Sequence, residues 1–220
     1  MAERPILFNG DMVRAILAGQ KTVTRRPFVL GERDIRGRQY DDPEGVDAFV
    51  RGFNDGDWWE PLRCPAGTAG DLLYVRETFT FRGNDDHHPV RADGSLSPYP
   101  HHDAAIAYRA TDDVYGPDGN SGPWRPSIHM PKWAARIWLR VTAVRVERLR
   151  SITNKQAMAE GFEGWYAPAY VGLYDVVGPD AVEPVEDYRE AWGDMYGKQD
   201  GLSWEANPWV WVIEFERHYR

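Results

Sequence analysis

A short helix that runs directly into a β-branched strand is the feature that most constrains the fold of this chain. Asn9 is a suitable N-cap for a helix over residues 10–18, and Gly19 occupies the position where a left-handed backbone ends a helix. The apolar residues of this helix share one face: Val13, Ile16 and Leu17. β-Branched residues then favour a strand over residues 21–26.

The connection from helix to strand, Gly19–Arg26, concentrates reactive side chains without a carboxylate among them. Neighbouring cations disfavour protonation of Lys21, and a lysine of lowered pKa can act as a base or nucleophile. The Thr24 hydroxyl is a candidate partner. Strand alternation places Lys21 and Thr24 on opposite faces, so they meet only if Lys21 belongs to the turn or the strand twists or bulges. The alternative is a polar edge strand without chemistry.

Composition narrows the classes of protein that fit. The chain has 220 residues, a formal net charge of -8 and a pI near 5.3, which argues against binding long nucleic acid mainly through phosphates. Its single cysteine, Cys64, excludes an internal disulfide and a cysteine zinc cluster. Without a long apolar run or an apolar signal stretch, the sequence predicts a cytoplasmic protein that does not span a membrane.

Further elements follow from hydrophobic periodicity. The sequence predicts strands over residues 6–8, 72–79, 104–110, 137–146 and 209–216. It predicts a helix that is capped by Ser151 or Thr153 and ends at Gly161, and another that begins at Pro184. The expected fold is a single domain, mainly β with short helices (α+β), in the form of a small barrel. Long insertions are expected at about 28–69, 83–133 and 162–206.

Four residues outside the Gly19–Arg26 segment are candidates for a site. Glu77 shares a strand face with apolar residues, which suits either a strand-end residue or, as we prefer, a pocket acid. Trp124 and His129 lie in a proline-bounded aromatic loop that could form a wall for a planar ligand or pack on the barrel. Glu160 lies in the last helical turn, where a carboxylate opposes the helix dipole, and this misfit suggests another use.

Histidine pairs occur at His87-His88 and His101-His102 in loops rich in Gly, Pro and Asp. Their spacing matches no helical or strand pattern of metal ligands, and adjacent side chains diverge. We therefore interpret them as solvated loop residues and predict no metal site.

The segment Ile16–Arg26 resembles the signature of the ASCH domain, a Gly-x-Lys-x-x-x-x-Arg pattern after a short helix. Three later stretches fall in the order of that family: 70–75, 148–162 and 212–215. The family fold is a PUA-like β-barrel. The longer form of this chain, with its stretches 126–131 and 207–215, is similar to ASCH proteins found in phages and prophages.

The resemblance extends to the small bacterial N4-acetylcytidine amidohydrolases, in which a lysine, a threonine and a glutamate are held to be catalytic. It carries these roles to Lys21, Thr24 and Glu160, and Arg26 matches the closing arginine of the motif. It implies hydrolysis of an acylamide on the exocyclic amine of a cytosine nucleoside, without a metal or an organic cofactor. This sequence departs from the small enzymes in its long insertions and in the loop 124–133, which would reshape the mouth of the pocket.

Two other classes of function stay open. One is a non-catalytic module that binds RNA or a modified nucleotide, for which a local basic patch is available: Arg25, Arg26, Arg125, Lys132 and Arg136. The other is RNA cleavage, which fits a lysine and a hydroxyl less well. With a nucleoside as substrate, Arg26, Glu77, Trp124 and His129 are the expected binding residues.

Overall fold

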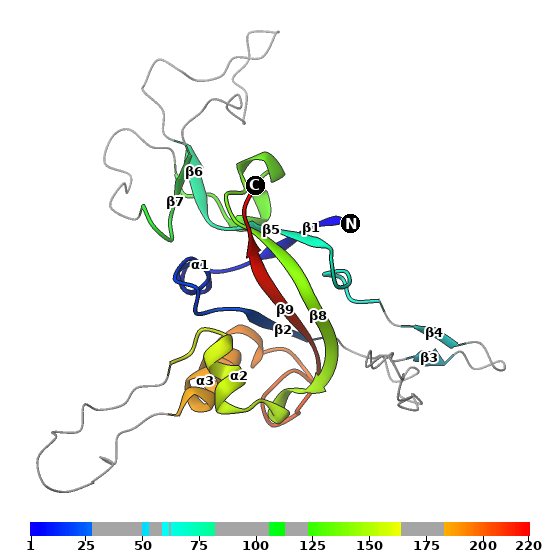
Figure 1. Cartoon of the computed structure of the whole chain (residues 1–220). Helices are drawn as coiled ribbons and strands as arrows, with labels where there is room; N and C mark the ends of the chain where they lie inside the picture. The colour runs from blue at the N-terminus through cyan, green and yellow to red at the C-terminus, as the bar shows by residue number, and fades with distance from the viewer. Residues whose placement is uncertain (28–49, 53–58, 62, 82–105, 113–122, 164–182) are drawn as a thin grey trace, which may run out of the picture. The chain divides into compact units, whose positions relative to one another are not determined.

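The computed structural model describes residues 1–27, 50–52, 59–61, 63–81, 106–112, 123–163 and 183–220 (Figure 1). The histidine pairs and large parts of the three predicted insertions lie outside these ranges. The chain divides into two compact units. The first comprises Met1–Ala18, Asp71–Arg140 and Arg217–Arg220, and the second comprises Gly19–Gly70 and Val141–Glu216.

Strands are the commonest regular elements in the described chain. Among the described residues, a five-stranded sheet has the hydrogen-bonded strand order β1 (Glu3–Leu7), β5 (Leu72–Arg76), β8 (Trp138–Arg148), β9 (Trp209–His218) and β2 (Val23–Pro27). Two further sheets have two strands each: β3 (Val50–Gly52) with β4 (Trp59–Pro61), and β6 (Phe79–Phe81) with β7 (Ile106–Tyr108). β1 and β5 are parallel, whereas β5–β8 and β2–β9 are antiparallel, so the sheet is mixed. The expected class, mainly β with short helices, is confirmed. In the described ranges no helix has the length and apolar character needed to cross a membrane.

In the first unit, β1 (Glu3–Leu7) pairs with β5 (Leu72–Arg76), which pairs with the start of β8 (Trp138–Arg148). Helix α1 (Gly10–Leu17) begins as predicted, because the Asn9 side chain accepts a hydrogen bond from the Met12 amide at 2.9 Å. The first unit also contains two short 3-10 helices, Ser127–His129 and Lys132–Ala134, in the segment predicted as a proline-bounded loop.

The predicted strand 72–79 is wrong in its extent. β5 ends at Arg76, and a separate strand, β6 (Phe79–Phe81), pairs with β7 (Ile106–Tyr108). The break falls at Glu77, whose amide donates to the Met130 sulfur at 3.2 Å instead of to a strand neighbour. Both halves are apolar on alternate residues, so the sequence pattern continues across a break that only tertiary contacts create.

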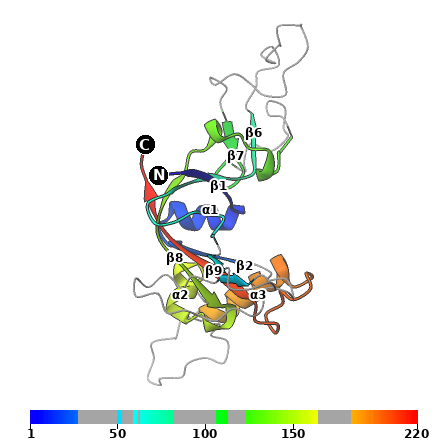
Figure 2. The ribbon, with the colours of Figure 1, turned by 90° about the vertical axis from the view of Figure 1, so that its right-hand side faces the viewer.

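In the second unit, β2 (Val23–Pro27) pairs with β9 (Trp209–His218), and helices α2 (Asn154–Ala159) and α3 (Pro184–Tyr196) lie side by side (Figures 1 and 2). Their core joins both strands to both helices. Its buried members are Val23, Leu149, Ile152, Ala157, Tyr188, Trp192, Val210 and Val212. Trp192 is fully buried, and its indole nitrogen donates to the Leu202 carbonyl at 2.8 Å.

The segment 28–69, predicted to be irregular, contains a short antiparallel pair. β3 (Val50–Gly52) pairs with β4 (Trp59–Pro61). Strands of three residues are too short to establish a period-two pattern, which is why periodicity did not indicate them.

The short helix α2 matters because its end carries a candidate site residue. Thr153 caps its start in a reciprocal capping box with Gln156, so the prediction of Thr153 as a cap is confirmed. The helix stops at Glu160 and is followed by Gly161 with φ of 98°, a conformation that favours glycine. Caps at both ends therefore fix the length of α2 and the place of Glu160.

Replacing Thr153 with Ala should lower the free energy of unfolding by about 1 kcal/mol, because a backbone N–H at the helix start loses its acceptor. Thr153→Ser keeps the hydroxyl and is the matched control. Urea unfolding curves of the three proteins measure the difference. Equal losses in Thr153→Ala and Thr153→Ser would contradict the capping role.

Candidate functional site

Lys21 lies in the connection that precedes β2. The amide of the next residue, Thr22, donates to the Ala159 carbonyl at 2.8 Å, and the Thr22 carbonyl accepts from the Phe215 amide at 2.9 Å. The chain at this point therefore bridges the end of α2 and strand β9, and regular pairing of β2 begins at Val23. The predicted strand 21–26 is accordingly two residues too early at its start and one residue short at its end.

The Lys21 side chain is completely buried and reaches the C-terminal end of α2. Its Nζ donates to Glu160 Oε2 at 2.6 Å and to the Glu160 backbone carbonyl at 2.9 Å. Carbonyl groups at a helix end lack partners within the helix, and the ammonium satisfies one of them as well as the carboxylate. This contact explains why Glu160 is tolerated at the negative end of a helix dipole, which the sequence marked as a misfit.

Arg25 binds the other oxygen of the same carboxylate. Its Nη1 lies 3.3 Å from Glu160 Oε1, and its Nη2 lies 3.2 Å from Glu147 Oε2. Arg145 continues the series through its Nε, 2.6 Å from Glu147 Oε1, and through an ion pair with Glu214. Positive and negative groups thus alternate from buried Lys21 to half-buried Glu214. We call this series the charge network, and its members are Lys21, Glu160, Arg25, Glu147, Arg145 and Glu214.

Three of the six members of the charge network were not predicted from the sequence as site residues: Glu147, Arg145 and Glu214. Arg145 and Glu147 are two residues apart in β8 and so share a face, and this spacing was the available signal. Glu214 comes from β9, where it is the register partner of Val23. Only the strand register brings these groups together.

The pKa of Lys21 is lowered. The main cause is burial, which removes water from the ammonium; Glu160 acts in the opposite direction, and Arg26 and Arg25 add to the lowering. The sequence left open whether Glu160 or the neighbouring cations would prevail. With burial included, the effects that favour the neutral amine prevail.

Thr24 is also buried, and it is the register partner of Ile213. Because strand side chains alternate, Thr24 lies on the face opposite Val23, which belongs to the core under α2 and α3. None of the described residues is a hydrogen-bond partner of the Thr24 hydroxyl. The structure therefore joins Lys21 directly to Glu160, while the role of Thr24 stays a prediction.

Arg26 is half-buried at the end of β2. Its Nη1 lies 3.5 Å from the Tyr196 hydroxyl on α3, so the side chain extends toward the helix that covers the core of this unit. It acts on Lys21 electrostatically, and its expected contact with a substrate stays a prediction.

The other three predicted binding residues belong to the first unit. Glu77 is buried and held at 2.9 Å by both Nε and Nη2 of Arg136, whose guanidinium lies 4.0 Å from the Tyr108 ring centre. Its carboxylate is therefore neutralised by a fixed partner. Trp124 is half-buried and His129 is exposed. Binding roles for these three residues remain predictions.

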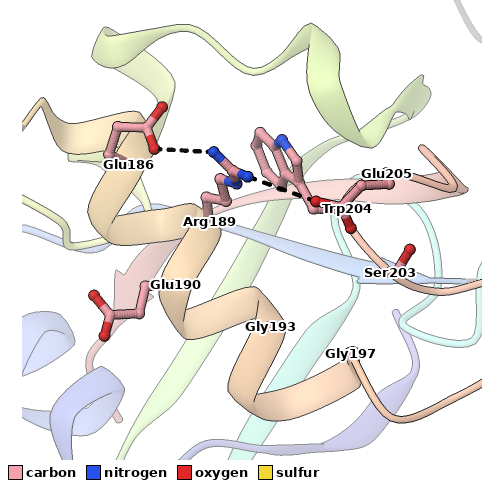
Figure 3. A pocket seen from close by; sticks show the side chains of 8 residues that line it. All are labelled: Glu186, Arg189, Glu190, Gly193, Gly197, Ser203, Trp204 and Glu205. Carbon is pink, nitrogen blue, oxygen red and sulfur yellow. Dashed lines mark hydrogen bonds and ion pairs between the residues drawn. The ribbon is translucent and has the colours of Figure 1, made fainter.

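A separate open pocket of about 380 Å³ lies along α3. Figure 3 shows Arg189 between Glu186 and Glu205, with the Trp204 ring beside it. None of the predicted site residues lines this pocket. In the described ranges, His, Cys, Asp and Glu form no group of three that could hold a metal ion.

Comparison with known proteins gives one structural likeness. The sequence matches no protein-family model and no curated protein. Among solved structures, the chain is similar to the ASCH domain from Lactobacillus crispatus JV V101, with a TM-score of 0.39 and 11% sequence identity. The alignment covers 100% of this chain and 81% of that chain.

The lowered pKa of Lys21 predicts a pH-dependent contribution to stability. Between the folded pKa and the ordinary value of 10.5, the unfolded chain binds a proton at Lys21 that the folded chain does not. Stability attributable to Lys21 should therefore rise with pH across this window, by at most about 1.4 kcal/mol per pH unit. Below the folded pKa the cost of the buried ammonium is fully present.

The measurement is the free energy of unfolding of the wild type minus that of Lys21→Met, from denaturant curves between about pH 7 and about pH 10. Subtracting the variant removes the titration of groups common to both proteins. A difference that falls as pH rises would mean that the pKa of Lys21 is raised.

Proposed function

We propose that this chain is an ASCH-type amidohydrolase that removes an acyl group from the exocyclic N4 amine of a cytosine nucleoside. The observation that carries the proposal is the completely buried Lys21, hydrogen-bonded to Glu160 at 2.6 Å, within the motif Gly19–Arg26. The arrangement joins the two residues that the resemblance assigns to catalysis, although they are 139 positions apart. N4-acetylcytidine is the proposed substrate.

In the proposed reaction, the Thr24 Oγ attacks the acyl carbonyl carbon and its proton passes to the neutral amine of Lys21. The resulting tetrahedral intermediate carries an oxyanion, which the guanidinium of Arg26 stabilises. Collapse breaks the bond between the acyl carbon and N4, and the Lys21 ammonium returns the proton to the leaving amine. Water then hydrolyses the acyl ester on Thr24, which releases a carboxylic acid and restores the hydroxyl.

Lys21 suits the role of base only when it is neutral at working pH. A lysine at its ordinary pKa is almost entirely protonated at neutral pH, and a catalytic base is most effective when its pKa lies near the operating pH. Burial supplies a shift in the required direction. Glu160 orients the amine through its carboxylate and its backbone carbonyl.

The alternative, a module that binds RNA, has less support from the side-chain contacts. It depends on five cations as a basic patch, and two of them already have buried carboxylate partners: Arg25 with Glu160 and Arg136 with Glu77. These two guanidiniums are not available to bind phosphate without breaking a buried ion pair, which is costly.

The purified protein should convert N4-acetylcytidine to cytidine, measured by liquid chromatography. Thr24→Ala and Lys21→Arg should each lower kcat/KM by about 10²-fold or more, since one lacks the nucleophile and the other cannot become neutral. Thr24→Ser keeps a hydroxyl and should retain measurable activity.

Circular dichroism and thermal unfolding of each variant establish that loss of turnover is not loss of fold. Near wild-type rates in Thr24→Ala or Lys21→Arg would refute the assigned roles. If acetylated deoxycytidine and longer acyl groups are also inert with the wild type, the hydrolase proposal fails, and RNA titrations at varied salt would test the alternative.

A further inference from the structure

Lys21 and Arg25 share one carboxylate, and this sharing sets a requirement on the proposed reaction. Glu160 presents Oε2 to Lys21 and Oε1 to Arg25. The side chains of Lys21 and Arg25 are 0% exposed, and that of Glu160 is 3% exposed, so water does little to screen their charges. Protonation or deprotonation of Lys21 therefore changes the electrostatic free energy of the Glu160 carboxylate.

A buried carboxylate needs a cation. If Lys21 were its only partner, loss of the Lys21 proton would leave Glu160 as an unpaired buried charge, a strongly unfavourable state. Glu160 would then hold the proton on Lys21 and prevent it from acting as a base. A second cation on the same carboxylate removes this obstacle, and an arginine is suited to the task because it does not lose its proton in proteins.

We propose that Arg25 is a positioning residue that compensates the charge of Glu160, so that Lys21 can become neutral without leaving a buried carboxylate unpaired. Arg25 does this through Nη1, while Nη2 is anchored to Glu147 and keeps the guanidinium in place. The catalytic part of this inference rests on the proposed function, whereas the electrostatic part concerns the titration of Lys21 alone. Position 25 is a variable position of the Gly-x-Lys-x-x-x-x-Arg pattern, so the motif itself assigns Arg25 no role.

Other charged or titratable groups near Lys21 or in the charge network come from β2, α2, α3, β8 and β9. β2 provides Arg25 and Arg26, and the end of α2 provides Glu160. Further groups on α3, β8 and β9 are Tyr188, Tyr196, Arg145, Glu147 and Glu214. Burial raises the pKa of Tyr188 well above its ordinary value, with Glu160 acting in the same direction, so Tyr188 stays neutral. Arg25 is therefore, among the residues that the structure describes, the permanent cation paired with Glu160.

The direct test measures the titration of Lys21 without a substrate. The chain has four lysines, Lys21, Lys132, Lys155 and Lys198, so NMR of protein labelled at the lysine side chains gives few signals. Lys21→Met assigns the signal of Lys21. In Arg25→Gln, the midpoint of Lys21 should move to higher pH by about one unit or more, because a neighbouring cation is lost and Glu160 depends on Lys21 alone. An unchanged or lower midpoint in the folded variant would overturn the proposal.

Glu147→Gln is the matched variant, in which the titration midpoint of Lys21 should shift in the opposite direction. It replaces the carboxylate that competes for Arg25 with a neutral amide whose oxygen can still accept from Nη2, so Arg25 stays beside Glu160 and the midpoint of Lys21 should move to lower pH. If Arg25→Gln does not fold, Glu147→Gln carries the test by itself, and a rise in its midpoint overturns the proposal. A rise in both variants would mean that lost packing, rather than lost charge, controls Lys21.

Activity provides a second, separable readout. The acid limb of the pH profile of kcat/KM should move to higher pH in Arg25→Gln, and activity should recover as pH increases. A structural variant is the control: Arg136→Gln also removes an arginine from a buried carboxylate, Glu77, and should leave the acid limb in place. A limb that moves equally in both variants would contradict a specific role for Arg25. Absence of turnover in the wild type would refute the proposed function, while the NMR titration would still decide the role of Arg25.

Discussion

The buried ion pair between Lys21 and Glu160 is the interaction on which the architecture of the second unit depends. It joins two residues 139 positions apart, one in the connection that precedes β2 and the other at the end of α2. Removing two charges from water costs on the order of several kcal/mol per ion, and the cost is offset only if the geometry is good and further hydrogen bonds are made. Both conditions are met here, because Nζ lies 2.6 Å from Oε2 of Glu160, and the Glu160 backbone carbonyl and Arg25 make further hydrogen bonds.

The same contact and the burial around it determine the pKa of Lys21. Burial favours a neutral Lys21, while Glu160 favours an ammonium, and the result is a lysine of lowered pKa held in one orientation. Arg25, which contacts both Glu160 and Glu147, extends this balance into the charge network. The pKa of Lys21 is therefore set by competing electrostatic effects rather than by a single strong one.

Much of the local structure could be predicted because it follows from short-range rules. Asn9 and Thr153 are caps, and Gly19 and Gly161 end helices with positive φ, as their positions indicated. The misfit of Glu160 with the helix dipole suggested another use for this residue, and in the structure its carboxylate contacts Lys21 and Arg25. Predictions failed where tertiary contacts overrode a continuous pattern, as at Glu77, where an apolar alternation crosses from β5 into β6.

The sequence by itself determined the mainly β class, the helix caps and the motif Gly19–Arg26, in which a lysine is close to two arginines. Each of these depends on residues close together in the chain. Only the tertiary structure decided which charges meet. Arg25 contacts Glu160 through the approach of α2 to β2, and Glu147, Arg145 and Glu214 join through pairing of distant strands. Burial of Lys21, and hence the direction of its pKa shift, is likewise a property of packing that no short stretch of sequence contains.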